Sequence, residues 1–175
     1  KMLNEAVLRM KGDSRDGTDE FETVADLQID AFIPDAYIRN EALKLDIYRR
    51  IAAVESEEER DDMLEELIDR FGEPPKSVLN LLEITGLRGK AHRLYIKEVQ
   101  GRPDRIVFTM YERARINPAK IPQLIASMDG AMTFRKSEPP QFIYEMKNSR
   151  KKYSGNLLEV TGQILDDMEI LKEQE

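Results

Sequence analysis

The sequence predicts an α+β fold: a helical first half (a strand plus three helices), then two β-hairpins around a short helix and a C-terminal amphipathic helix. Two observations favour this fold. Apolar residues recur at helical spacing over most of residues 40–94. After residue 94 the period shortens, and alternating runs flank two turn-rich spacers, GRPD and SEPP. A chain of 175 residues is long enough for one domain.

The first 25 residues are expected to precede the folded domain. Residues 1–11 predict a short helix, and residues 12–25 predict a linker because they are polar and contain glycine. We expect one α+β domain over residues 26–175, opening with a strand at 26–34. The chain starts at Lys1 instead of a methionine, so we expect a piece of a longer protein.

Three helices should follow the strand. The first, at about 40–54, has a regular apolar stripe, and the third, at about 76–94, is apolar on more than one side. Between them, residues 55–73 contain ten acidic side chains and two arginines, a net charge of −8 against −7 for the whole chain. Ser56 and Glu59 predict a capping box at the start of this acidic helix.

The second half should contain two hairpins and two helices. The hairpin strands are expected at 95–100, 105–111, 131–136 and 141–147. A short helix is expected at 118–128, between the hairpins. The chain should close with an amphipathic helix at about 156–173.

Composition and motifs exclude several kinds of site. Without cysteine there is no disulfide or thiolate zinc site, and a cytoplasmic location fits. No apolar run reaches the roughly 18–20 residues of a membrane span. The sequence lacks the glycine-rich motifs that hold nucleotide phosphates, and its one histidine, His92, is expected to be a capping or surface cation. We therefore expect no catalytic, cofactor-binding or metal-binding residues, although Asp61, Asp62 and Glu65 could conceivably hold Mg²⁺.

Two kinds of charged surface remain as candidate binding sites. Asp62, Glu66 and Asp69 recur at i, i+4 and i+7 and therefore share one helix face, which could dock a basic partner or simply keep the domain soluble. Glu66 and Arg70 should form a weak pair within the helix. The basic stretches at 88–93 and 147–152 could contact phosphates, but the overall acidity argues against a broad nucleic-acid surface.

Residues 29–84 resemble the carboxy-terminal domain of the bacterial transcription-repair-coupling factor, the TRCF domain. The resemblance rests on the order of FIPDAYI, the YRRIA helix and EELIDRFGEPP before a leucine-rich helix. Beyond about residue 100 only the layout is similar. Tyr95 is a departure, because the family often has a glycine at the end of the long helix. Residues 2–11 look like the last helix of the motor portion that precedes this domain.

The resemblance implies a function that composition does not show. The parent protein resembles an ATP-dependent DNA translocase that displaces stalled RNA polymerase and recruits UvrA for nucleotide excision repair. ATP and magnesium would bind elsewhere in that parent, with no cofactor in this chain. The domain would act as a clamp on the amino-terminal UvrA-like module, hiding the UvrA-binding surface and repressing the motor.

The resemblance also assigns residues to this contact. In the matching EELID segment, Glu66 and Asp69 would face arginines of the amino-terminal module, and Asp62 lies on the same helix face. The alternative is an accessory nucleic-acid-binding domain of the same translocase, using the two basic stretches. An enzyme that uses the carboxylates is a further rival.

Overall fold

The computed structural model describes residues 18–150 and 152–172, and the predicted helix at 1–11 lies outside them. The α-helices are α2 (Glu41–Ala52), α3 (Glu57–Phe71), α4 (Lys76–Arg93), α5 (Ile121–Ser127) and α6 (Leu157–Asp167). The strands are β1 (Val24–Leu27), β2 (Ile96–Gly101), β3 (Arg105–Met110), β4 (Met132–Arg135) and β5 (Gln141–Glu145). Short 3₁₀ turns are η1 (Thr18–Glu20), η2 (Pro118–Lys120), η3 (Met146–Asn148) and η4 (Met168–Leu171). The predicted α+β class is confirmed.

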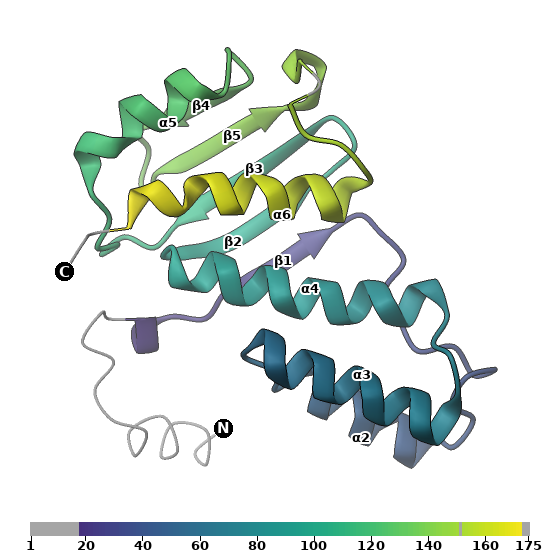
Figure 1. The fold of residues 1–175 in the computed structure, drawn as a ribbon. Coiled ribbons are helices and arrows are strands. Elements are labelled where there is room, and N and C mark those ends of the chain that lie inside the picture. The colour runs from purple at the N-terminus through teal and green to yellow at the C-terminus, as the bar shows by residue number, and fades with distance from the viewer. Residues whose placement is uncertain (1–17, 151, 173–175) are drawn as a thin grey trace.

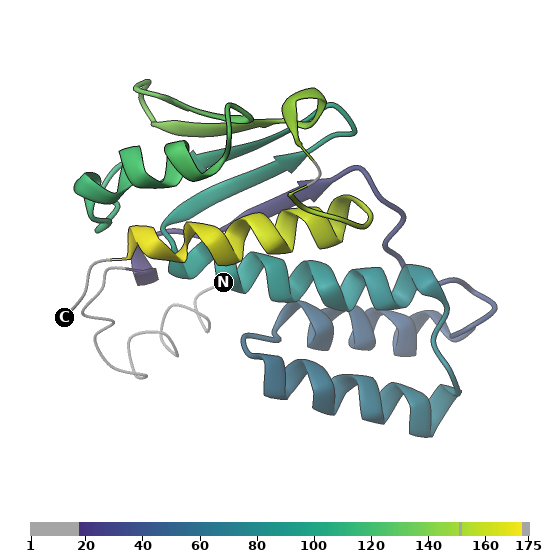
Figure 2. The ribbon, with the colours of Figure 1, turned by 45° about the horizontal axis from the view of Figure 1, so that its top comes forward.

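The five strands form one sheet in the order β1-β2-β3-β5-β4. The hairpins β2–β3 and β4–β5 are antiparallel, and β5 joins them by pairing with β3. β1 lies parallel to β2 at one edge, with Leu27 opposite Gly101. Helices α4, α5 and α6 cover one face of this sheet (Figures 1 and 2).

The core consists of two hydrophobic clusters that meet at α4. The first lies between the sheet and α4, α5 and α6, and includes Leu87 and Ala91 of α4. The second lies among α2, α3 and α4, and includes Val78 and Leu82 of α4. Figure 1 shows the α2–α3 pair on the side of α4 that faces away from the sheet.

Side-chain caps set the starts of the helices at the expected places. Asn40 caps α2 by accepting a hydrogen bond from the amide of Leu43. Ser56 caps α3 by accepting one from the amide of Glu59, at 3.1 Å. The carboxylate of Glu59 accepts from the amide of Glu55 instead of that of Ser56, so only half of the predicted capping box forms. α6 has the complete capping box, between Asn156 and Glu159.

The predicted linker at 12–25 and strand at 26–34 are wrong in their bounds. Residues 18–25 belong to the folded domain, because the buried hydroxyl of Thr23 donates to the Ile96 carbonyl at 2.7 Å and Phe21 packs on the first cluster. The strand ends at Leu27, after which the chain turns away from the sheet and buries Ile33 in the second cluster. Among the apolar residues of 29–33, Ile29 still packs on the first cluster, Ile33 is buried in the second, and Phe32 is 48% exposed, so their spacing does not reflect a continuing strand.

Two smaller differences concern helix ends. The predicted helix at 156–173 ends as an α-helix at Asp167 and continues as η4 to Leu171. Tyr95, the departure from the family pattern, follows α4 with φ +62°, a conformation that glycine adopts more easily. The tyrosine is held there by burial, with 5% of its surface exposed, and by stacking with Phe21. Among the described residues no helix is long and apolar enough to cross a membrane.

Candidate functional site

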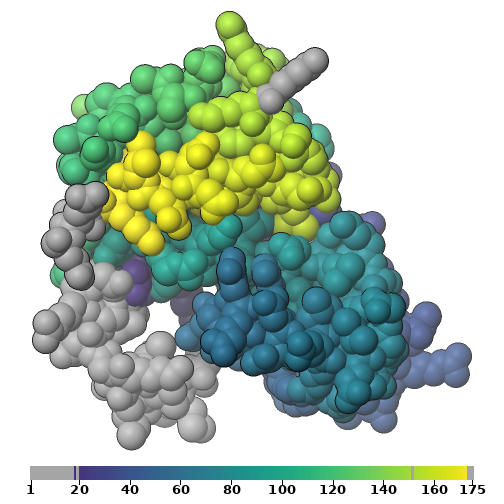
Figure 3. All heavy atoms as spheres, in the orientation of Figure 1, coloured from purple at the N-terminus to yellow at the C-terminus, as the bar shows by residue number. Residues whose placement is uncertain are grey.

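α3 separates its apolar and acidic side chains onto two sides. Leu67 is fully buried and Met63 is 5% exposed in the second cluster, whereas the carboxylates lie at the surface. The blue atoms of α3 can be followed at the molecular surface in Figure 3. The exposed acids of the helix are Glu57, Glu58, Glu59, Asp61, Asp62, Glu65 and Asp69. The predicted acidic surface is therefore present, on a helix that the core holds in place.

Glu66 is already paired within the domain. Both oxygens of its carboxylate accept hydrogen bonds from the guanidinium of Arg50 on α2, each at 2.5 Å. A third bond, at 2.9 Å, comes from Arg70 and confirms the predicted pair within the helix. The bonds from Arg50, followed by those from Arg70, lower the pKa of Glu66 from 4.5 to about 2. Glu66 is therefore ionised at physiological pH, and the two arginines balance its negative charge.

Asp62 and Asp69 have a different environment from Glu66. Both are exposed, and neither makes an ion pair or hydrogen bond with another described residue. With spacings of i, i+4 and i+7 the three carboxylates share one face of α3. The predicted trio thus consists of two free carboxylates around one that is occupied by arginines.

A shallow hollow of about 330 Å³ lies beside this face, at the junction of α2 and α3. Ala53, Val54 and Met63 provide its apolar part. Its charged rim consists of Arg50, Glu59, Asp62 and Glu66. With three carboxylates and one guanidinium, the hollow favours a cationic side chain over an anionic one.

The magnesium site that the sequence left open does not form. Asp61, Asp62 and Glu65 are all exposed on α3, and the part of the chain that the structure describes contains no group of three acidic or histidine side chains placed to hold a metal. Successive helical positions are turned by about 100°, so Asp61 and Asp62 point in different directions.

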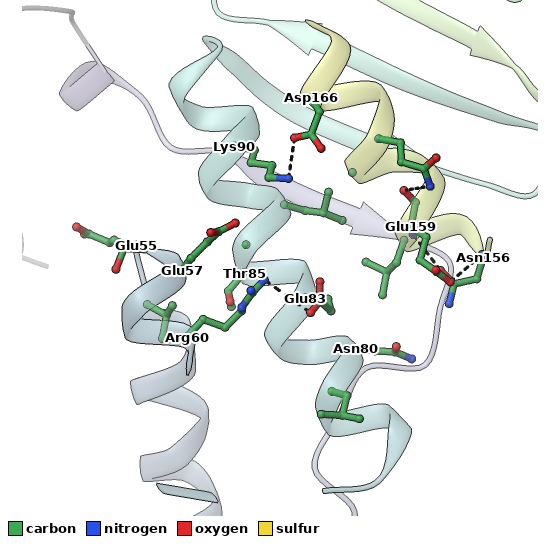
Figure 4. A pocket seen from close by; sticks show the side chains of 18 of the residues that line it. Glu55, Glu57, Arg60, Asn80, Glu83, Thr85, Lys90, Asn156, Glu159 and Asp166 are labelled. Atoms are coloured by element: carbon green, nitrogen blue, oxygen red, sulfur yellow. Dashed lines mark hydrogen bonds and ion pairs between the residues drawn. The ribbon is translucent and has the colours of Figure 1, made fainter. Parts of the chain in front are cut away.

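A second hollow, of about 570 Å³, lies between α3, α4 and α6 (Figure 4). Four of the charged side chains that line it form ion pairs between helices. Lys90 of α4 pairs with Asp166 of α6 at 2.8 Å, and Arg60 of α3 lies 3.6 Å from Glu83 of α4. These pairs link α4 to α6 and to α3.

The two basic stretches are only partly free to contact phosphates. Three of their cations already have partners: Arg88 with the Ala52 carbonyl, Lys90 with Asp166, and Lys152 with the Ser127 carbonyl. Arg93, Lys147 and Arg150 are exposed, and Lys151 lies outside the described residues. The stretches thus offer fewer cations than the sequence suggested.

Two features of the site differ from sequence reasoning or were missed by it. His92, in the last turn of α4, is partly buried instead of lying at the surface, with Nδ1 2.9 Å from the hydroxyl of Thr23 and its ring tilted against that of Phe21. Arg50, the main partner of Glu66, was not singled out. Its position on α2 beside the apolar stripe indicated that it could reach a neighbouring helix, but the sequence did not show which acidic residue of that helix it would contact.

The fold and this surface define an α+β domain whose exposed feature is an acidic helix, and comparison with known proteins shows its family. Residues 27–121 match the TRCF domain, which is more than half of the chain. The chain belongs to the TRCF domain family. The match continues beyond residue 84, where the traced resemblance ends, to residue 121.

Its relatives are much longer proteins. The transcription-repair-coupling factor of Bacillus subtilis (strain 168) is 35% identical over 114 residues, which cover 65% of this chain and 10% of that protein. That of Escherichia coli (strain K12) is 35% identical over 98 residues, 56% of this chain and 8% of the relative. The chain thus spans about a tenth of the curated relatives that it matches.

A solved structure supports the fold independently. It is described as the crystal structure of the C-terminal domain of transcription-repair coupling factor, and it superposes with a TM-score of 0.71. The alignment covers 86% of this chain and 94% of that chain, at 24% sequence identity. This likeness establishes the arrangement of helices and strands.

Proposed function

We propose that this chain is the C-terminal regulatory domain of a transcription-repair-coupling factor and that it has no catalytic activity of its own. Family membership and the shared name of its relatives support the first part. The second part is supported by the larger hollow, in which four charged side chains are engaged in pairs between helices.

The domain acts by docking its acidic helix on a basic surface of the amino-terminal UvrA-like module of the same protein. The strongest support is the pair of unpartnered carboxylates, Asp62 and Asp69, on the face that the resemblance assigns to this contact. Buried Met63 and Leu67 fix α3 on the core, so little ordering is needed before docking. Arginines suit this face because they bind carboxylates through two parallel hydrogen bonds.

Docking would hide the surface that UvrA binds and hold the motor in a repressed state. The motor, its ATP and magnesium, and the contact with RNA polymerase would all lie in other parts of the parent protein. The domain would then link the repair factor's activity to the opening of one intramolecular contact, in the cytoplasm.

Binding of this chain to the separately expressed amino-terminal module tests the proposal. Changing Glu66→Ala and Asp69→Ala together should weaken binding by about 30-fold or more, since truncating one side of a buried charge pair costs about 2–5 kcal/mol. Glu57→Ala with Asp61→Ala is the matched control, because it removes the same charge from another side of α3. Equal affinities for the two double variants would show that the face is only solvated.

The alternative, an accessory nucleic-acid-binding domain, has a separate test. In a gel-shift series across salt concentrations, duplex DNA should bind weakly or not at all near physiological salt, because the chain carries a net charge of −7 and several basic side chains are occupied. Submicromolar binding with a steep salt dependence would favour the alternative.

A further inference from the structure

Glu66 has little capacity left for an external partner. An ionised carboxylate offers about four lone-pair positions, and Glu66 already accepts three hydrogen bonds, two from Arg50 and one from Arg70. A partner arginine that binds through two parallel bonds needs two acceptor positions. It can reach Glu66 fully only if one of the domain's own arginines withdraws.

Arg50 is the arginine better placed to withdraw. Its side chain is 42% exposed, and it comes from a different helix, so its release leaves α3 unchanged. Asp46 lies one turn earlier on α2 and offers a nearby carboxylate when Glu66 is lost. Arg70 is held more firmly, because it lies on α3 itself and its guanidinium rests 5.0 Å from the centre of the Phe71 ring.

The hollow next to Arg50 gives an incoming cation a place to approach. It is bounded by Asp62 and Glu66 on the proposed docking face, and its apolar part, formed by Val54 and Met63, suits the aliphatic stem of an arginine. A second guanidinium can therefore lie beside Glu66 while Arg50 is still bound, and can then take over its hydrogen bonds.

We propose that Arg50 is an internal competitor for Glu66, which occupies the carboxylate in the free domain and gives it up to a guanidinium of the docking partner. Arg50 thereby weakens docking and keeps it reversible. This inference rests on the proposed function, since it takes Glu66 to be part of the docking surface.

The test measures the affinity of Arg50→Ala for the amino-terminal module. Binding should tighten by about two- to fivefold, which corresponds to the usual strength of an exposed ion pair that no longer has to be broken. Arg49→Ala is the matched control, because Arg49 is the neighbouring arginine on α2, is exposed, and forms no ion pair with another described residue. It should change the affinity less than Arg50→Ala does.

The same change in a Glu66→Ala background separates competition from general charge effects. In that background, Arg50→Ala should raise the affinity no more than Arg49→Ala does, because the Glu66 carboxylate for which Arg50 competes is absent. Unchanged or weaker binding of Arg50→Ala in the natural background would overturn the inference, as would an equal gain from Arg49→Ala. If the variant with both Glu66→Ala and Asp69→Ala binds with unchanged affinity, the proposed function is wrong, and so is the inference about Arg50. If that variant binds more weakly but Arg50→Ala does not bind more tightly, only the inference about Arg50 is wrong.

Discussion

The side chain of Leu27 occupies the space that a β-carbon on Gly101 would need. The two residues face each other across the parallel pair β1 and β2. A β-carbon built on Gly101 would lie 2.4 Å from Cδ2 of Leu27 and 3.4 Å from Cδ2 of Leu157 on α6. The absence of a side chain at Gly101 therefore lets β1, β2 and α6 pack at this edge of the sheet.

Replacing Gly101 with alanine should destabilise the domain by about 1–3 kcal/mol, the usual cost of overpacking a filled core. Gly162→Ala on α6 is the control, because its new β-carbon would meet Leu87 at an ordinary 3.6 Å. In a helix that change should be neutral or stabilising by up to about 1 kcal/mol. Urea unfolding of both variants measures the difference, and similar free energies of unfolding would contradict the packing argument.

Leu67→Ala should lower the free energy of unfolding by about 2–5 kcal/mol, because Leu67 is fully buried between the helices of the second cluster. Leu45→Ala on α2 provides a control of the same chemistry, since that leucine is 52% exposed. It should change stability by less than about 0.5 kcal/mol. Thermal melts that shift equally for both leucines would show that α3 is not anchored as described. Phe71 is only partly buried, so its truncation should cost less than that of Leu67.

The ion pair of Glu66 should make stability depend on pH in the acid range. The pKa of Glu66 is lowered in the folded state, from 4.5 to about 2, so its contribution is complete above about pH 5 and is lost as the pH falls towards 2. Because its side chain is 33% exposed, solvent screening limits this contribution to at most about 1 kcal/mol.

Unfolding of Glu66→Gln and the unchanged chain, compared at pH 6 and pH 2.5, measures this contribution. The difference in free energy should be present at pH 6 and largely gone at pH 2.5. Glu58→Gln is the control, because Glu58 lies on the same helix and pairs with no other described residue. A difference for Glu66→Gln that does not vary with pH would contradict the assigned pair.

Thr23→Val should destabilise the domain by about 1–3 kcal/mol. The threonine hydroxyl, with only 8% of the residue exposed, donates to the Ile96 carbonyl and lies 2.9 Å from His92 Nδ1, and valine leaves these groups without that partner. Thr133→Val, at an exposed position of β4, should have little effect. Equal unfolding midpoints for the two variants would rule out a stabilising role for this hydrogen bond.

Local signals in the sequence predicted most of the elements. The side-chain cap at Ser56 placed the start of α3, and alternation placed all four hairpin strands within a residue or two. The parallel pairing of β1 with β2 was not predicted, because it joins segments about seventy residues apart and leaves no local pattern. The strand predicted at 26–34 extended too far because Ile33 is buried among helices and not in the sheet.

The candidate site was predicted only in part. Helical spacing placed Asp62, Glu66 and Asp69 on one face and predicted the pair with Arg70, since both depend on one helix. The pairing of Glu66 with Arg50 depends on the register between two helices, which apolar periodicity does not determine. The resemblance supplied the assignment to a contact, and the structure adds the pairing with Arg50.

Because α4 contributes side chains to both hydrophobic clusters, the two clusters share a single stiff rod of 18 residues, about 27 Å long. Neither cluster can melt completely while the rod stays intact, so the domain should lose both in one cooperative step. The amides in the middle of α4 should then be the slowest to exchange with solvent. A force applied to α3 would reach the sheet through α4, since α4 packs against both.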